Sequence, residues 1–183
     1  MSSPANRPAD PVELRPIVFL DVDGPLNLWA AGERPAGFVE HRFRVSRWGR
    51  RRLRMWLNPA HGTLLLELAQ RTGAELVWAS TWGVAANATV GPALGLPELA
   101  SINFVPGSAL GDGQWKFPAV SRFAGDRPLV WFDDDFELYP AAREAFVARR
   151  RGRVKLVRVD PHVGITVDQL VDVEEWLRVV GAA

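Results

Sequence analysis

Short apolar runs that end in polar residues recur along the chain, and this pattern constrains the fold more than any other feature. Apolar runs of about four to eight residues between turn residues are typical of strands buried on both faces. The runs that we predict to be strands are Ile17–Leu20, Leu76–Ala79, Leu129–Phe132 and Val154–Val159. The segments predicted to be helices are Leu64–Gln70, Lys116–Phe123, Ala141–Arg150 and Val167–Val180, the last with Thr166 as its N-cap. Strands that alternate with helices predict an α/β fold, in which helices cover both faces of a parallel sheet.

One segment after the first strand breaks this alternation. From Arg52 to Leu57, apolar side chains alternate with basic or aromatic ones, which is the period of two expected of a half-exposed strand. We interpret residues 37–58 as a small β-hairpin insertion that projects from the sheet. The insertion is too short for a large helical cap, so we expect the site beside it to admit large substrates.

The length and the ends of the chain predict one domain. At about 150 residues per domain, 183 residues suffice for a single domain, which we place at residues 16–183. Residues 1–15 are rich in Pro, Ser and Ala and lack the apolar stretch of a signal peptide, so we expect a flexible leader and a cytoplasmic protein. No run of about 18 apolar residues is present, so no membrane span is expected. The absence of cysteine excludes disulfide bonds, zinc–thiolate sites and a cysteine nucleophile.

Acidic and hydroxyl side chains follow three of the predicted strands. Asp21 and Asp23 follow the first, Ser80 follows the second, and the three aspartates of Asp133–Asp135 follow the third. Because ligands of open parallel sheets bind beyond the carboxyl ends of the strands, we expect these groups to form one site. Carboxylates this close together repel one another unless a cation lies among them, and hard oxygen ligands favour Mg²⁺.

The spacing of Asp21 and Asp23 has a chemical consequence. In an extended segment, residues two apart share a face, so both carboxylates can address one ligand, and Gly24 allows a tight turn behind them. One carboxylate can attack phosphorus while its neighbour transfers protons. Lys116 is one of only two lysines among the 22 basic residues, and this isolated point charge is a further candidate for the site.

These elements, in this order, resemble the haloacid dehalogenase (HAD) superfamily of phosphotransferases. The four motifs of that superfamily correspond here to FLDVDGPLN, LVWAST, Lys116 within QWKFPAV, and LVWFDDDF, which together span Phe19 to Phe136. The resemblance implies a Rossmann-like parallel sheet and the hydrolysis of a phosphate ester. A narrower set, VWASTWG, VWFDDDF and DPHVGIT, is similar to the HAD domains of Swiss Army Knife RNA repair proteins, which implies a phosphorylated nucleic-acid end as the substrate.

The resemblance also implies a role for each matching residue. Asp21 is implied as the nucleophile that becomes an aspartyl-phosphate, and Asp23 as the group that protonates the leaving oxygen and then activates water. Ser80 is implied to hydrogen-bond the phosphoryl group, with Thr81 as the alternative hydroxyl, and Lys116 to neutralise the charge of that group. The implied ligands of Mg²⁺ are Asp21, the backbone carbonyl of Asp23, Asp133 and Asp134.

Arginine is concentrated inside the predicted hairpin, where seven arginines occupy the thirteen residues from Arg42 to Arg54. Two interpretations stay open, a basic flap that attracts phosphodiesters and a solvated face in an arginine-rich protein. Tryptophans beside the motifs are candidates for stacking on bases, whereas Trp78 and Trp131 lie within apolar runs and are expected in the core. The candidate substrate-binding residues are Arg44, Arg52, Arg54, Thr81, Trp82 and Trp115.

Three classes of function follow from these observations. The first is a Mg²⁺-dependent phosphomonoesterase that acts through an aspartyl-phosphate, either on nucleic-acid ends or on small metabolites and nucleotides. The second is a receiver-like regulatory module. It is disfavoured because the phosphorylated aspartate of receiver modules ends a middle strand, whereas Asp21 and Asp23 follow the first strand here. The third is a binding protein of the HAD fold that has no catalytic activity.

Overall fold

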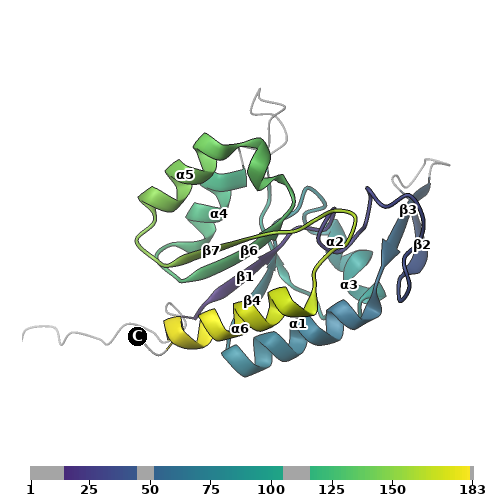
Figure 1. Cartoon of the computed structure of the whole chain (residues 1–183), viewed down its shortest axis with the longest axis horizontal. Coiled ribbons are helices and arrows are strands. Elements are labelled where there is room, and N and C mark those ends of the chain that lie inside the picture. Colours follow the sequence, from purple (N-terminus) through teal and green to yellow (C-terminus); the bar gives the residue numbers. More distant parts are fainter. Residues whose placement is uncertain (1–14, 45–51, 105–115, 182–183) are drawn as a thin grey trace, which may run out of the picture.

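The computed structural model describes residues 15–44, 52–104 and 116–181 (Figure 1). Residues 1–14 of the predicted leader lie outside these ranges, and so do Arg47, Arg50, Arg51 and Trp115. Among the described residues, no helix combines the length and the apolar character needed to cross a membrane.

The centre of the molecule is a five-stranded parallel sheet with the strand order β5-β4-β1-β6-β7. Its strands are β1 (Ile17–Leu20), β4 (Glu75–Trp78), β5 (Ala100–Ser101), β6 (Leu129–Asp133) and β7 (Val154–Arg158). In the central strand, Leu20 is in register with Trp78 on one side and with Phe132 on the other. The residues that follow β1, β4 and β6 therefore lie side by side, where the carboxyl ends of these parallel strands meet.

Helices cover both faces of the sheet, which confirms the predicted architecture (Figure 1). The flanking helices are α1 (Pro59–Thr72) and α6 (Val167–Gly181) on one face, and α4 (Lys116–Ala124) and α5 (Pro140–Arg149) on the other. Alternate residues of β1 enter separate hydrophobic cores, since Val18 packs with the first pair of helices and Phe19 with the second. Trp78 and Trp131 are 0% and 1% exposed, as expected of core residues.

The ends of the long helices follow from local hydrogen bonds. The Asn58 side chain accepts a hydrogen bond from the Ala60 N–H at 3.0 Å, so α1 begins several residues before the predicted start. Thr166 and Gln169 exchange side-chain-to-backbone hydrogen bonds of 3.1 and 3.2 Å, which is the reciprocal cap of α6. The prediction of Thr166 as an N-cap is therefore confirmed.

The predicted hairpin is present as a separate two-stranded sheet of β2 (Val39–Arg44) and β3 (Arg52–Leu57). It stands beyond the carboxyl edge of the main sheet (Figure 1) and is the only regular element in the described residues between β1 and α1. Arg42 lies opposite Arg54 in its register, and Arg44 lies opposite Arg52. Short elements that the sequence did not predict also occur, namely β5, α2 (Ala85–Ala88), α3 (Val90–Ala93) and the 3-10 helix η2 (Asp135–Leu138).

Candidate active site

Three aspartates meet where β1 and β6 end. One carboxylate oxygen from each of Asp21, Asp133 and Asp134 lies within 4.8 Å of the others. The Asp21 N–H donates to the Phe132 carbonyl at 3.0 Å, which extends the pairing of the two strands to the site. Asp21 is 5% exposed and Asp133 1% exposed, so two of the three charges lie in the protein interior. The sheet thus brings together aspartates that are more than a hundred residues apart in the sequence.

Lys116 is the cation of this cluster. Its Nζ donates to Asp21 Oδ2 at 2.5 Å and to Asp133 Oδ2 at 2.8 Å, and lies 3.9 Å from Asp135 Oδ2. Burial opposes the charge of the amine, but the two contacting carboxylates outweigh burial and raise the pKa of Lys116 above its usual value. Lys116 therefore stays protonated across the physiological range.

The aspartates carry more negative charge than Lys116 can balance. Burial, followed by the charge of Asp21, raises the pKa of Asp133 well above its usual range, although Lys116 opposes the shift. Burial also raises the pKa of Asp134 to about 6, against the hydrogen bond that the Trp29 indole donates to it at 3.1 Å. With all three carboxylates ionised, one ammonium would leave two negative charges, and this donor set fits a divalent cation with a preference for oxygen ligands, such as Mg²⁺.

The turn behind Asp21 requires glycine for two reasons. Gly24 has a φ of +90°, a conformation that other residues rarely adopt. A Cβ atom at this position would lie 2.4 Å from Cγ of Asp134. The tight turn at Gly24 therefore brings its backbone close to a carboxylate of the cluster itself.

The Asp23 side chain lies outside the three-aspartate cluster and is held by two donors. Asn27 Nδ2 donates to Asp23 Oδ1 at 2.6 Å, and Trp82 Nε1 donates to Asp23 Oδ2 at 3.0 Å. Asn27 Oδ1 in turn accepts a hydrogen bond from the backbone N–H of Trp56 in the hairpin at 3.2 Å. Sequence reasoning missed Asn27, because no periodicity marks a contact that depends on how the loop after β1 folds.

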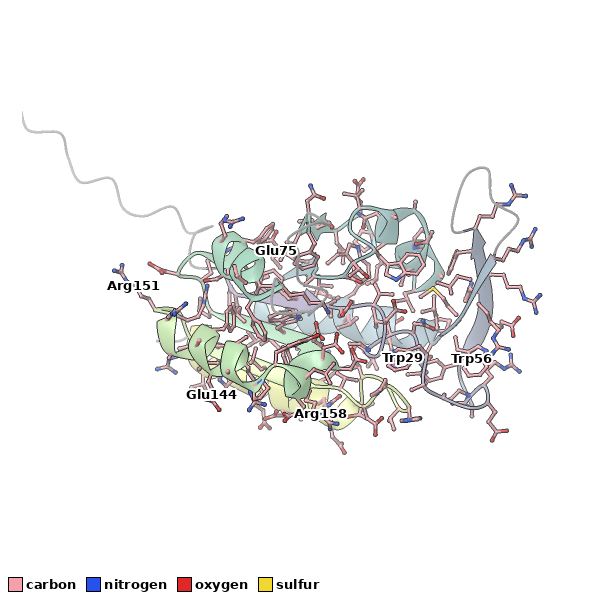
Figure 2. All side chains as sticks on the ribbon, turned by 90° about the horizontal axis from the view of Figure 1, so that it is seen from above. Trp29, Trp56, Glu75, Glu144, Arg151 and Arg158 are labelled. Atoms are coloured by element: carbon pink, nitrogen blue, oxygen red, sulfur yellow. The ribbon has the colours of Figure 1, made fainter. Side chains whose placement is uncertain are left out.

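Trp29 is the second residue of the site that sequence reasoning missed. It lies in the same loop as Asn27, is 61% exposed, and its indole contacts Asp134. Figure 2 shows Trp29 and Trp56 toward the end of the molecule that carries the hairpin, away from Arg151. A tryptophan five residues after Gly24, outside every predicted strand and helix, is the sequence signal that would have pointed to this residue.

Ser80 and Thr81 occupy different environments after β4. Ser80 is fully buried just after the carboxyl end of β4, next to β1. Its Oγ accepts a hydrogen bond from the backbone N–H of Trp82 at 3.4 Å. Thr81 is exposed and lines a neighbouring cavity. Ser80 is therefore enclosed where β4 ends, while Thr81 belongs to the cavity wall.

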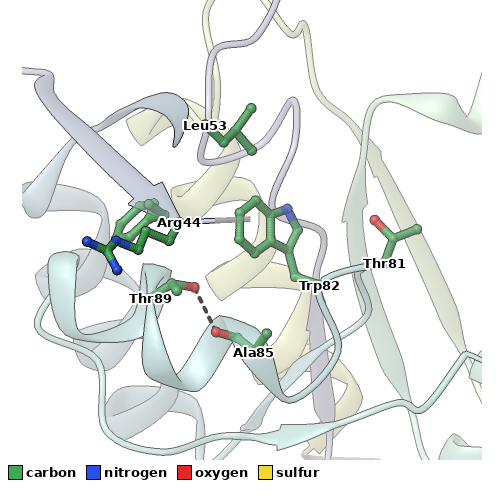
Figure 3. A pocket seen from close by; sticks show the side chains of 7 residues that line it. Arg44, Leu53, Thr81, Trp82, Ala85 and Thr89 are labelled. Atoms are coloured by element: carbon green, nitrogen blue, oxygen red, sulfur yellow. Dashed lines mark hydrogen bonds between the residues drawn. The ribbon is translucent and has the colours of Figure 1, made fainter. Parts of the chain in front are cut away.

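A cavity of about 310 Å³ lies between the hairpin and the segment after β4 (Figure 3). Its lining residues are Phe43, Arg44, Leu53, Thr81, Trp82, Ala85 and Thr89. Of the predicted substrate-binding residues, Arg44, Thr81 and Trp82 meet here, whereas Arg52 and Arg54 lie on the hairpin outside the lining. The Arg54 guanidinium instead lies 4.8 Å from the Trp56 ring centroid.

The chain matches the family model described as the HAD domain in Swiss Army Knife RNA repair proteins over residues 17–170. The matched segment includes Asp21, Asp23, Asp133, Asp134 and Asp135, together with Ser80 and Lys116. Among curated proteins, none matches the chain.

Proposed function

The chain belongs to the family of HAD domains in Swiss Army Knife RNA repair proteins, and from this membership we propose that it hydrolyses phosphate monoesters through a phosphorylated Asp21. The observation that carries the proposal is the environment of the Asp21 carboxylate. Its Oδ1 accepts the Val22 N–H at 2.6 Å and its Oδ2 accepts from Lys116 at 2.5 Å. A buried carboxylate that two donors fix at the carboxyl end of the central strand has the position required of a nucleophile.

The reaction has two balanced steps. In the first, an Asp21 oxygen bonds to phosphorus as the ester P–O bond breaks, and Asp23 donates a proton to the leaving oxygen. In the second, Asp23 takes a proton from water, the water oxygen bonds to phosphorus, and the bond to Asp21 breaks to release phosphate.

The other residues of the site assist these steps by charge and orientation. Lys116 fixes Asp21 and places positive charge beside the transferring group, while Ser80 donates a hydrogen bond to it. Asp21, Asp133 and Asp134, with the backbone carbonyl of Asp23, would hold Mg²⁺. The bound ion supplies charge neutralisation that carboxylates and phosphate together require.

The hairpin supports a phosphorylated nucleic-acid end as the substrate. Like charges directly opposite each other destabilise a strand pair, yet Arg42 faces Arg54 and Arg44 faces Arg52. Among the described residues, the one carboxylate within ion-pair distance of these four is Glu40, which contacts Arg42 at 2.7 Å. A surface built in this way favours a polyanionic ligand.

The test is Mg²⁺-dependent turnover of end-phosphorylated oligonucleotides, with nucleotides and sugar phosphates for comparison. We expect Asp21→Asn to abolish turnover of every substrate, because the amide keeps the shape of the side chain but not its nucleophilicity. Full activity of this variant would refute the mechanism. A preference for small phosphates, without salt-dependent binding of oligonucleotides, would instead assign the protein to small-metabolite hydrolysis.

A further inference from the structure

The cavity beside the active site is built from two separate parts of the chain. The hairpin supplies Phe43, Arg44 and Leu53, and the residues after β4 supply the rest of the lining (Figure 3). Trp82 belongs both to this lining and to the active site, because its Nε1 donates to Asp23 Oδ2 at 3.0 Å. A ligand in the cavity would therefore contact the residue that holds the proposed proton donor.

The chemistry of the lining restricts what the cavity can bind. Phe43, Leu53 and Trp82 present apolar or aromatic surface. The Thr89 hydroxyl donates a 2.7 Å hydrogen bond to the Ala85 carbonyl, and Thr81 adds a second hydroxyl to the lining (Figure 3). The one charged lining residue is Arg44, and no carboxylate in the described part of the chain lies within ion-pair distance of it. Such a cavity favours a flat aromatic ring, whose faces pack on apolar and aromatic side chains, attached to an anionic group, over a sugar or a cation.

We propose that this cavity binds the nucleobase of the nucleotide that carries the scissile phosphate, and that Trp82 determines this specificity. The inference rests on the proposed phosphatase function and adds the substrate group that the site selects. The volume of about 310 Å³ is at the lower end of the range for small-molecule sites, which suits one base rather than several. Stacking on an aromatic side chain tolerates every base, because every base has a π face.

The position of Asp23 connects the cavity to the reaction. Asp23 gives its proton to the leaving oxygen in the proposed mechanism, so the remainder of the leaving group extends from the side of Asp23. Trp82 and the cavity lie on that side. With the phosphate at Asp21, a nucleoside leaving group can place its base against Trp82 and its anionic link near Arg44.

Two substitutions of Trp82 separate stacking from positioning. Trp82→Phe keeps an aromatic ring but removes the N–H that contacts Asp23, whereas Trp82→Ala removes both. Kinetics would be measured with a nucleoside monophosphate, with the matching ribose phosphate that lacks a base, and with an oligonucleotide carrying the same terminal nucleotide.

We expect Trp82→Phe to lower kcat on all substrates alike and to retain the preference for the base. Trp82→Ala should lower kcat similarly and also raise KM by about 5- to 150-fold for base-containing substrates only, which is the loss of one base–aromatic stack. A lower KM for the oligonucleotide than for the mononucleotide would identify nucleic-acid ends as the source of the base, and equal values would identify free nucleotides.

A second pair of variants guards against misfolding of the Trp82 variants. Leu53→Glu places a carboxylate in the cavity wall and should raise KM for base-containing substrates, while Val84→Glu is the control, because Val84 is 65% exposed and outside the lining. Equal KM of the wild-type protein for the nucleotide and the base-free phosphate, with Asp21-dependent turnover of both, would overturn the base subsite alone. If no phosphate ester that is tested shows Asp21-dependent turnover, the proposed function itself would be overturned.

Discussion

Lys116 and Lys155, the two lysines of the chain, provide a matched comparison at the scale of single residues. Lys116 contacts two carboxylates in the interior, whereas Lys155 contacts Asp172, whose side chain is 65% exposed, at 2.8 Å. We expect Lys116→Met to lower the free energy of unfolding of the metal-free protein by about 3–5 kcal/mol, because it leaves buried negative charge without a partner.

Lys155→Met should lower the free energy of unfolding by less than about 1 kcal/mol, because an ion pair with an exposed carboxylate is screened by water and contributes little. Denaturant titration in the presence of a chelator measures both values. Similar costs for the two variants would contradict the buried location of the Lys116 contacts.

Gly24 allows a second comparison between residues of the same type. Gly73 at the end of α1 also has a positive φ, of +69°, but a Cβ there would meet nothing within 4 Å. Gly73→Ala should therefore cost about 1 kcal/mol of stability and leave Mg²⁺ binding unchanged. Gly24→Ala should weaken Mg²⁺ binding strongly, because its Cβ displaces the Asp134 carboxylate. Isothermal titration with Mg²⁺ tests this difference, and equal affinities for the two variants would contradict it.

At the scale of elements, the hairpin is fixed to the domain on one face and charged on the other. Met55 and Leu57 of β3 are buried in the main core, and the Trp56 N–H contacts Asn27, which also holds Asp23. The arginines of β2 and β3 therefore lie on a surface whose position is tied to that of the proposed proton donor.

Arg52→Ala on this surface should weaken the binding of end-phosphorylated oligonucleotides of every sequence, and it should reduce the slope of log K against log salt by about 1. Arg122→Ala on α4 is the control, since Arg122 is an exposed arginine on a helix outside the hairpin. Binding isotherms over a range of salt concentrations provide the measurement. A slope that Arg52→Ala leaves unchanged would mean that the hairpin arginines are a solvated face.

The sequence allowed prediction of the elements with strong patterns and of the acids at their ends. Four strands and the hairpin were predictable because their apolar residues run continuously or alternate with a period of two. β5 spans two residues, and α2 and α3 span four each, too few for either period to repeat. Asn27 and Trp29 escaped prediction for a related reason, since their roles depend on the irregular loop after β1 rather than on any element.

At the scale of the whole molecule, the acidic cluster links folding to pH and to metal. The pKa of Asp134 rises from 3.8 to about 6 on folding, so the folded protein binds more protons than the unfolded chain between these values. This group therefore makes the metal-free protein less stable as the pH rises through that window. Mg²⁺ bound at this cluster, as proposed, would replace the protons, so its stabilising effect should grow with pH.

We expect Mg²⁺ to raise Tm more at about pH 7.5 than at about pH 5, with a stabilisation of about 2.7 kcal/mol at a hundredfold excess over Kd. Thermal unfolding with Mg²⁺ or with a chelator at both pH values gives the comparison. Asp134→Asn serves as the control and should reduce the pH dependence of the Mg²⁺ effect. An equal increase in Tm at both pH values would mean that the cluster does not exchange protons for the ion.

The central place of β1 has a consequence for the motions that the protein can tolerate. Local opening begins where contacts are few, at sheet edges and exposed hairpins, and reaches the middle of a sheet last. Asp21 follows a strand with hydrogen-bonded neighbours on both sides, and its own N–H contacts Phe132. The outer strands and the hairpin can therefore open locally while the Asp21 carboxylate, the proposed nucleophile, keeps its position.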